Sequence, residues 1–161
     1  MAATATPALA ALTKAGVPHD VVKFNHDPRE HSFGVEAVNA LGANGIAPGQ
    51  IYKTLVIAVP SGLAVAIVQA GARLSLKAAA AALGVAKAAM AEPAVAERTT
   101  GYIVGAVSPF GQRKALPTVV DSSALAFERV FCSAGRRGWD VAVAPADLIR
   151  VTGAVTADIQ A

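Results

Sequence analysis

Two apolar runs separated by a short turn place the strongest constraint on this fold. The runs cover 55–59 and 63–69, and Pro60-Ser61-Gly62 lies between them. Runs of this length around a proline–glycine turn predict a β-hairpin. Apolar residues occupy both faces of both predicted strands, which is typical of strands in the middle of a sheet that helices cover.

Helix signals recur on both sides of this hairpin. Thr6-Pro7 predicts the start of an N-terminal helix that ends at Gly16, and Ser75 predicts the start of a helix over 76–83 that ends at Gly84. The other predicted helices cover 33–41 with Ser32 as the cap, 93 to about 98, and 146–152. The other predicted strands cover 19–24, 102–104, 117–121, 130–133, 140–144 and 155–159, with a turn over 134–139.

Strands therefore outnumber helices, and many neighbouring strands are joined closely enough to be antiparallel. We expect an α+β fold, in which one curved, mixed and open barrel-like β-sheet has helices packed outside it. The length of 161 residues suits one compact domain over 1–161.

Composition limits the class of protein. No stretch offers the roughly 20 uninterrupted apolar residues that a membrane-spanning helix needs, and residues 1–10 lack the basic segment of a signal peptide. One cysteine precludes an internal disulfide and fits a reducing cytoplasm. The three histidines have no evident companion ligands, so we expect no metal and no cofactor. A net charge of +3 permits contact with a nucleic-acid end without requiring it.

The segment 101–111, G-Y-I-V-G-A-V-S-P-F-G, is a candidate binding loop. The predicted strand ends at Gly105, and Ser108-Pro109 stiffens the exit of the loop. A rigid loop with available backbone N–H groups suits a polar ligand, although glycine and proline also mark ordinary turns.

Lys53 is the charged residue of the apolar run 51–59. Alternation along a strand puts it on the same face as Leu55 and Ile57, and puts Thr54 on the opposite face. A lysine on an apolar face either extends to solvent or meets an anionic or polar partner, and the residues alone leave both interpretations open.

Four segments together resemble the YbaK/EbsC family of aminoacyl-tRNA deacylases. They are V-K-F-N-H-D-P at 22–28, I-Y-K-T-L at 51–55, R-T-T-G-Y at 98–102 with the glycine loop behind it, and S-A-G-R-R-G-W-D at 133–140. Their order and spacing agree from about 21 to about 159. The resemblance implies a cytoplasmic trans-editing hydrolase that removes cysteine from Cys-tRNA(Pro), with Cys-tRNA(Cys) as a further substrate to test. It also implies tRNA as the substrate and prolyl-tRNA synthetase as the partner.

The resemblance also implies the site residues. Lys53 would donate to the ester carbonyl or to the terminal ribose and phosphate, and the Gly105 loop would present backbone N–H groups. The implied pocket residues are Phe24, Thr54, Ser108, Pro109, Ser133 and Asp140. Asp140 would hold the α-amino group or orient Lys53, and capping of the turn over 134–139 is an equal alternative. Phe24 stands where relatives often carry tyrosine, so only a packing or stacking role is left to it.

No protein nucleophile stands out in the sequence. Cys132 alternates with apolar residues in a predicted strand and is interpreted as a core residue. In the family, the sulfur of the substrate cysteine attacks its own ester. Two alternatives stay open: a deacylase for Ala-tRNA(Pro) or another small aminoacyl-tRNA, and a tRNA acceptor-end binding module that does not hydrolyse.

Overall fold

The computed structural model describes residues 5–27, 29 and 33–161. Within these ranges the chain forms five α-helices, eight strands and two 3₁₀ turns. In order they are α1 (Pro7–Lys14), β1 (Asp20–Lys23), α2 (Phe33–Gly42), η2 (Pro48–Gln50), β2 (Tyr52–Val59), β3 (Gly62–Gln69), α3 (Leu76–Leu83), β4 (Ala89–Met90), α4 (Pro93–Thr100), β5 (Thr118–Asp121), η3 (Ser122–Ala126), β6 (Val130–Arg136), β7 (Trp139–Val143), α5 (Pro145–Thr152) and β8 (Val155–Ala157).

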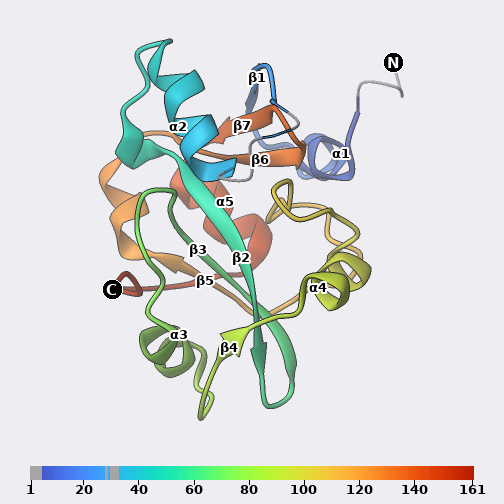
Figure 1. The fold of residues 1–161 in the computed structure, drawn as a ribbon, viewed down its shortest axis with the longest axis vertical. Helices are drawn as coiled ribbons and strands as arrows, with labels where there is room; N and C mark the ends of the chain where they lie inside the picture. Colours follow the sequence, from blue (N-terminus) through green and yellow to red (C-terminus); the bar gives the residue numbers. More distant parts are fainter. Residues whose placement is uncertain (1–4, 28, 30–32) are drawn as a thin grey trace.

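Two sheets form the framework (Figure 1). The larger has the order β4-β2-β3-β5-β8; β2 is antiparallel to β3 and β4, whereas β5 is parallel to β3 and β8. The smaller is antiparallel, in the order β1-β7-β6. An isolated parallel bridge between Ile51 and Phe131 links them without closing a barrel. The α+β fold predicted from the sequence is confirmed.

The β2–β3 hairpin is buried on both faces, as its sequence predicts. Val56 and Ile67 face the core that includes the smaller sheet, α1 and α4. Ile57 and Val68 face a second core beneath α3. Figure 1 shows β2 running from beside the smaller sheet down to the turn with β3, so one strand contributes side chains to several parts of the molecule.

Local capping signals set the helix ends. The Oγ of Ser75 accepts from the N–H of Ala78 at 3.1 Å, and Gly84 ends α3 in the left-handed conformation. Thr6 caps α1 and also donates from its hydroxyl to the carbonyl of Ala134 at 2.5 Å, which attaches the helix to β6. The proposed cap at Ser32 lies outside the described residues.

The strand predicted over 102–104 is wrong. Tyr102 turns inward and its hydroxyl donates to the carbonyl of Phe110 at 2.5 Å, while Ala106 closes a turn by donating to Ile103. No described strand pairs with this segment, so its β-forming residues make a loop instead.

The turn predicted over 134–139 is also wrong in extent. β6 continues to Arg136, and Arg136 pairs with Trp139 after an irregularity that follows Ser133. Gly135 has a φ of +94° within this irregularity, where glycine is favoured. The β6–β7 hairpin is consequently longer than predicted, and the turn at its tip is shorter.

Among the described residues, no helix is both long and apolar enough to cross a bilayer.

Candidate functional site

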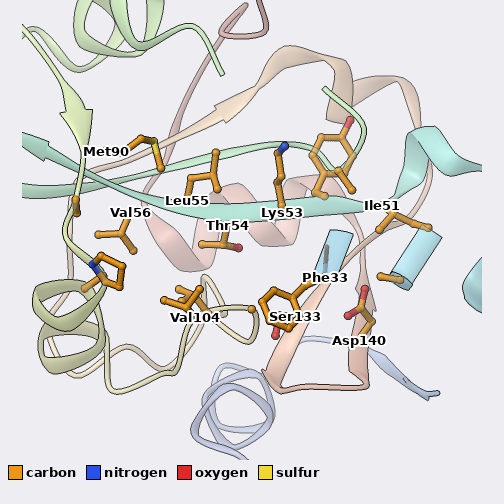
Figure 2. Close-up of a pocket in the computed structure, with 18 residues that line it drawn as sticks. Phe33, Ile51, Lys53, Thr54, Leu55, Val56, Met90, Val104, Ser133 and Asp140 are labelled. Atoms are coloured by element: carbon orange, nitrogen blue, oxygen red, sulfur yellow. The ribbon is translucent and has the colours of Figure 1, made fainter. Parts of the chain in front are cut away.

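A cavity of about 320 Å³ extends along β2 (Figure 2). Its walls come from six parts of the chain: β2 with the residue before it, Ala70 after β3, the start of α2, the β4–α4 region, the loop at 104–107 and the β6–β7 hairpin. Most of the lining is apolar. The oxygen-bearing side chains of Thr54, Ser133 and Asp140 also line it, so a polar group entering the cavity meets only a small number of partners.

The β6–β7 hairpin brings Ser133 and Asp140 together, because the two residues are directly paired across the strands. The Oγ of Ser133 accepts from the N–H of Gly135 at 3.1 Å. The Asp140 carboxylate has no hydrogen-bond donor among the described residues, and burial raises its pKa to about 7. It does not cap the hairpin turn, so the capping alternative is wrong.

Thr54 points from β2 toward the same side as Phe33, Val104 and Ser133 (Figure 2). Its Oγ1 is buried and makes no hydrogen bond within the described part of the chain. A buried hydroxyl without a partner carries a desolvation cost that a ligand would relieve. The expected orientation of Thr54, opposite to Lys53, is confirmed, and it places this hydroxyl on the cavity side.

Lys53 borders the cavity, but its side chain extends to the other side of β2 (Figure 2). The Nζ donates to the carbonyl of Ala72 at 2.7 Å, and burial lowers its pKa. Within the described chain no hydrogen bond or ion pair joins Lys53 to Asp140. The ammonium group is therefore positioned at an edge of the site, separately from the oxygen groups of Thr54, Ser133 and Asp140.

Gly105 forms part of the wall in a conformation that requires glycine. Its φ is +87°, and a Cβ added there would lie 2.5 Å from Cδ2 of Phe33. The preceding N–H, of Val104, donates to Oε2 of Glu97 at 2.8 Å, which ties the loop to α4. The Gly105 N–H has no acceptor among the residues described.

Phe24, Ser108 and Pro109 are not among the residues that line the cavity. Phe24 packs against the core between α2 and the smaller sheet, and its N–H donates to Gly138 at 2.7 Å. Ser108 is fully buried and accepts from the N–H of Phe110 at 3.3 Å. Five predicted site residues therefore line the cavity: Lys53, Thr54, Gly105, Ser133 and Asp140. Phe24, Ser108 and Pro109 do not line it.

Sequence reasoning missed Phe33 and Met90, which both line the cavity. Phe33 opens α2, where an aromatic residue is most simply interpreted as core, and Met90 lies in a two-residue strand that no periodicity indicates.

Cys132 is fully buried and burial raises the pKa of its thiol, so the prediction of a core position is confirmed. Among the described residues no three His, Cys, Asp or Glu side chains gather as metal ligands. His26 instead bonds Glu36, with 2.6 Å between Nδ1 and Oε1.

The arrangement suits a small ligand that carries an ammonium group and an ester. The Asp140 carboxylate can accept from the ammonium group, and the Gly105 N–H can donate to a carbonyl oxygen. Among the described residues, the lining holds no cysteine and no hydroxyl hydrogen-bonded to a histidine, which are the common activated nucleophiles.

A model of the aminoacyl-tRNA editing domain matches residues 31–151. EbsC of Enterococcus faecalis, provisionally named a Cys-tRNA(Pro)/Cys-tRNA(Cys) deacylase, is 37% identical over 116 residues, which are 71% of each chain. A crystal structure of a provisionally named trans-editing enzyme for prolyl-tRNA synthetase is 28% identical, with a TM-score of 0.83 over 96% of this chain and 95% of the other. A structure from work on computational grafting of epitope backbones onto scaffold proteins is 26% identical, with the same TM-score and the same coverage of both chains.

Proposed function

Because the chain belongs to the YbaK/EbsC family of aminoacyl-tRNA editing domains, we propose that it removes cysteine in trans from Cys-tRNA(Pro), and that Cys-tRNA(Cys) is a second substrate. The names of the two relatives above support this choice of substrates. The observation that carries the proposal is the cavity itself, an apolar space in which a buried carboxylate and a buried hydroxyl have no protein partner among the described residues.

The five cavity residues take separate roles in this proposal. Asp140 accepts from the α-ammonium group of the cysteinyl ester, and Thr54 and Ser133 bond the polar atoms beside it. The Gly105 N–H donates to the ester carbonyl oxygen, where negative charge develops. Lys53 gives up its hydrogen bond to the Ala72 carbonyl and donates instead to the terminal ribose or its phosphate.

The substrate supplies its own nucleophile. The cysteine thiolate attacks its ester carbonyl carbon, a C–S bond forms, and the bond from that carbon to the ribose oxygen breaks. The ribose oxygen takes a proton and the tRNA leaves, while the cysteine is left as a cyclic thioester. Water then opens the ring and releases free cysteine. The protein contributes geometry and polarisation, in keeping with a lining whose described residues include no activated nucleophile.

Incubation of the purified protein with cysteinyl-, alanyl- and prolyl-tRNA tests the proposal. Rapid release of cysteine alone is the expected result. Release of alanine instead would favour the Ala-tRNA(Pro) alternative. Binding of all three without release of any amino acid would show a binding module.

Prolyl-tRNA synthetase is the proposed partner, supported by the name of the similar crystal structure. A chain of 161 residues can contact little of a tRNA, so a synthetase that holds the tRNA would supply the selection of proline tRNA. Adding the synthetase should raise the rate for Cys-tRNA(Pro) more than the rate for Cys-tRNA(Cys).

A further inference from the structure

Arg137 joins two walls of the cavity although it does not line the cavity itself. It lies at the tip of the β6–β7 hairpin. Its Nη2 and Nε donate to the carbonyl of Val104 at 2.7 and 3.2 Å. Its Cζ lies 4.7 Å from the centre of the Phe33 ring. Val104 and Phe33 both line the cavity, so the guanidinium group is fixed at the rim.

These contacts occupy only part of the guanidinium group. Arginine has five N–H donors in a planar fork, and two of them serve Val104. The others have no acceptor among the described residues, and the side chain is half-buried, not covered. A fork held along one edge presents its remaining donors in a fixed direction, which suits a phosphate group.

The neighbouring Arg136 differs in its position. It stacks on Trp139, with Cζ 5.0 Å from the ring centre, and Lys23 lies 4.1 Å from the same ring. Trp139 precedes Asp140 in β7, so it faces away from the cavity side of the sheet. Two adjacent arginines of equal charge therefore lie in different places, one at the rim and one on the far face.

We propose that Arg137 binds a phosphodiester group near the 3′ end of the RNA whose terminal ester enters the cavity. This inference rests on the proposed function. The phosphate nearest the terminal ribose must pass close to the rim when the aminoacyl group is inside. The carbonyl that Arg137 holds belongs to Val104, the residue before Gly105, so one side chain links the phosphate to the loop that polarises the ester.

The test compares Arg137→Gln with Arg136→Gln, which removes the same charge from the adjacent residue. The probe is an RNA minihelix with a CCA end that carries no amino acid, and its Kd is measured over a range of salt concentrations. Arg137→Gln should weaken binding roughly tenfold or more and lower the slope of log K against log salt by about one. Arg136→Gln should keep most of the affinity.

Arg137→Lys distinguishes phosphate binding from a purely structural role. Lysine keeps the charge and should keep most of the salt slope, but it lacks the fork that holds Val104. If both Arg137 variants lose deacylation while their salt slopes equal that of the wild type, Arg137 only supports the wall and the inference is wrong. Thermal melts of each variant identify any that does not fold, and if Arg137→Gln is one of them, Arg137→Met, which also removes the charge, replaces it in the comparison of salt slopes.

The outcomes also separate this inference from the proposed function. A wild-type protein that deacylates Cys-tRNA(Pro), with equal slopes for Arg137→Gln and Arg136→Gln, overturns the role of Arg137 alone. A wild-type protein that neither binds the minihelix nor releases cysteine overturns both.

Discussion

Asp140 and Thr54 are the residues whose surroundings point most directly to a ligand. Both hold oxygen atoms in an apolar space, and neither oxygen group has a hydrogen-bond partner in the described chain. Buried polar groups of this kind destabilise a protein unless something binds them. We infer that their cost to stability is retained because the substrate satisfies them.

Asp140 should make stability depend on pH. Its carboxyl ionises near 3.8 when exposed and at about 7 in the folded protein. The folded state therefore binds the proton more tightly, so the stabilising contribution is complete below pH 3.8 and is lost as the pH rises to about 7. Asp140→Asn should raise the Tm at pH 8 by roughly 4 °C or more, with a much smaller change at pH 5.

The same carboxylate should govern activity in the opposite direction. In its proposed role, ionised Asp140 accepts from the substrate ammonium group, so kcat/KM of the wild type should rise with pH through about 7. In Asp140→Asn the part of this rise centred near pH 7 should disappear, and only the rise from ionisation of the substrate thiol, near ~8.5, should remain. A variant that is more stable at pH 8 but retains the full pH profile would show that Asp140 does not bind substrate.

Lys53→Ala should reduce kcat roughly 100-fold or more, with little change in Tm. The reason is that Lys53 is a charged donor at the edge of the cavity, and its structural bond is a single one to Ala72. Lys87→Ala removes an equal charge from an exposed position and is the control. Single-turnover deacylation and thermal melts measure the two effects, and near-normal turnover of Lys53→Ala would refute its role.

Cys132→Ala should keep most of the activity and lose about 1 kcal/mol of unfolding free energy. The thiol is fully buried in the core, and burial raises its pKa, so it neither reaches the cavity nor ionises readily. Urea unfolding and single-turnover assays are the measurements. Complete inactivity in a variant with normal unfolding would revive Cys132 as the nucleophile.

The loop from Gly101 to Gly111 is the element that shapes the site. Its inner anchor is Tyr102, which is buried and bonds Phe110, and its outer anchor is the bond from Val104 to Glu97. Gly105 directly follows the outer anchor, and a Cβ added there would lie 2.5 Å from the Phe33 ring. The loop is thus held rigid without belonging to a sheet.

Gly105→Ala should reduce kcat/KM by about 100-fold, as a small displacement of a catalytic group can do. The added Cβ would lie 2.5 Å from Phe33, so the loop and the ring must separate. Gly45→Ala is the matched control, because Gly45 has a φ of +81° and nothing within 4 Å of an added Cβ. Both variants should lose about 1–2 kcal/mol from the backbone conformation, and equal losses of activity would contradict the role given to the Gly105 loop.

At the scale of the whole molecule, the cavity exists because one long strand, β2, belongs to the larger sheet and begins beside the smaller one. β2 pairs with β3 and β4 in the larger sheet, and the bridge from Ile51 to Phe131 carries its start to the smaller sheet. The space beside β2 is then enclosed by α2, α4 and the loop at 104–107. No single element forms the site, and no lining residue in the described ranges is an activated nucleophile.

Cysteinyl-tRNA should therefore be cleared much faster than seryl-tRNA, although the two side chains are nearly equal in size. A thiol with a pKa near ~8.5 is partly ionised at neutral pH and is strongly nucleophilic, whereas an alcohol is not. Single-turnover rates for both substrates, with trapping of the cyclic thioester, are the measurement. Equal rates, or cysteine released without the cyclic species, would indicate an activated water molecule instead.

The sequence by itself determined the elements whose signals are local. Thr6, Ser75 and Gly84 set helix ends through hydrogen bonds and backbone conformations within a few residues. The apolar runs around Pro60-Ser61-Gly62 determined the hairpin, and alternation placed Lys53 and Thr54 on opposite faces. The motifs also led to the family, which the comparisons confirm.

Only the tertiary structure decided which face of β2 meets the cavity. Alternation separates Thr54 from Lys53 but cannot tell which side the loop at 104–107 and the β6–β7 hairpin will cover. The burial that raises the pKa of Asp140, and the contact of Arg137 with Phe33 and Val104, likewise depend on segments far apart in the sequence. Burial and side-chain contact are properties of the packed chain, whereas capping and alternation are properties of a few neighbouring residues.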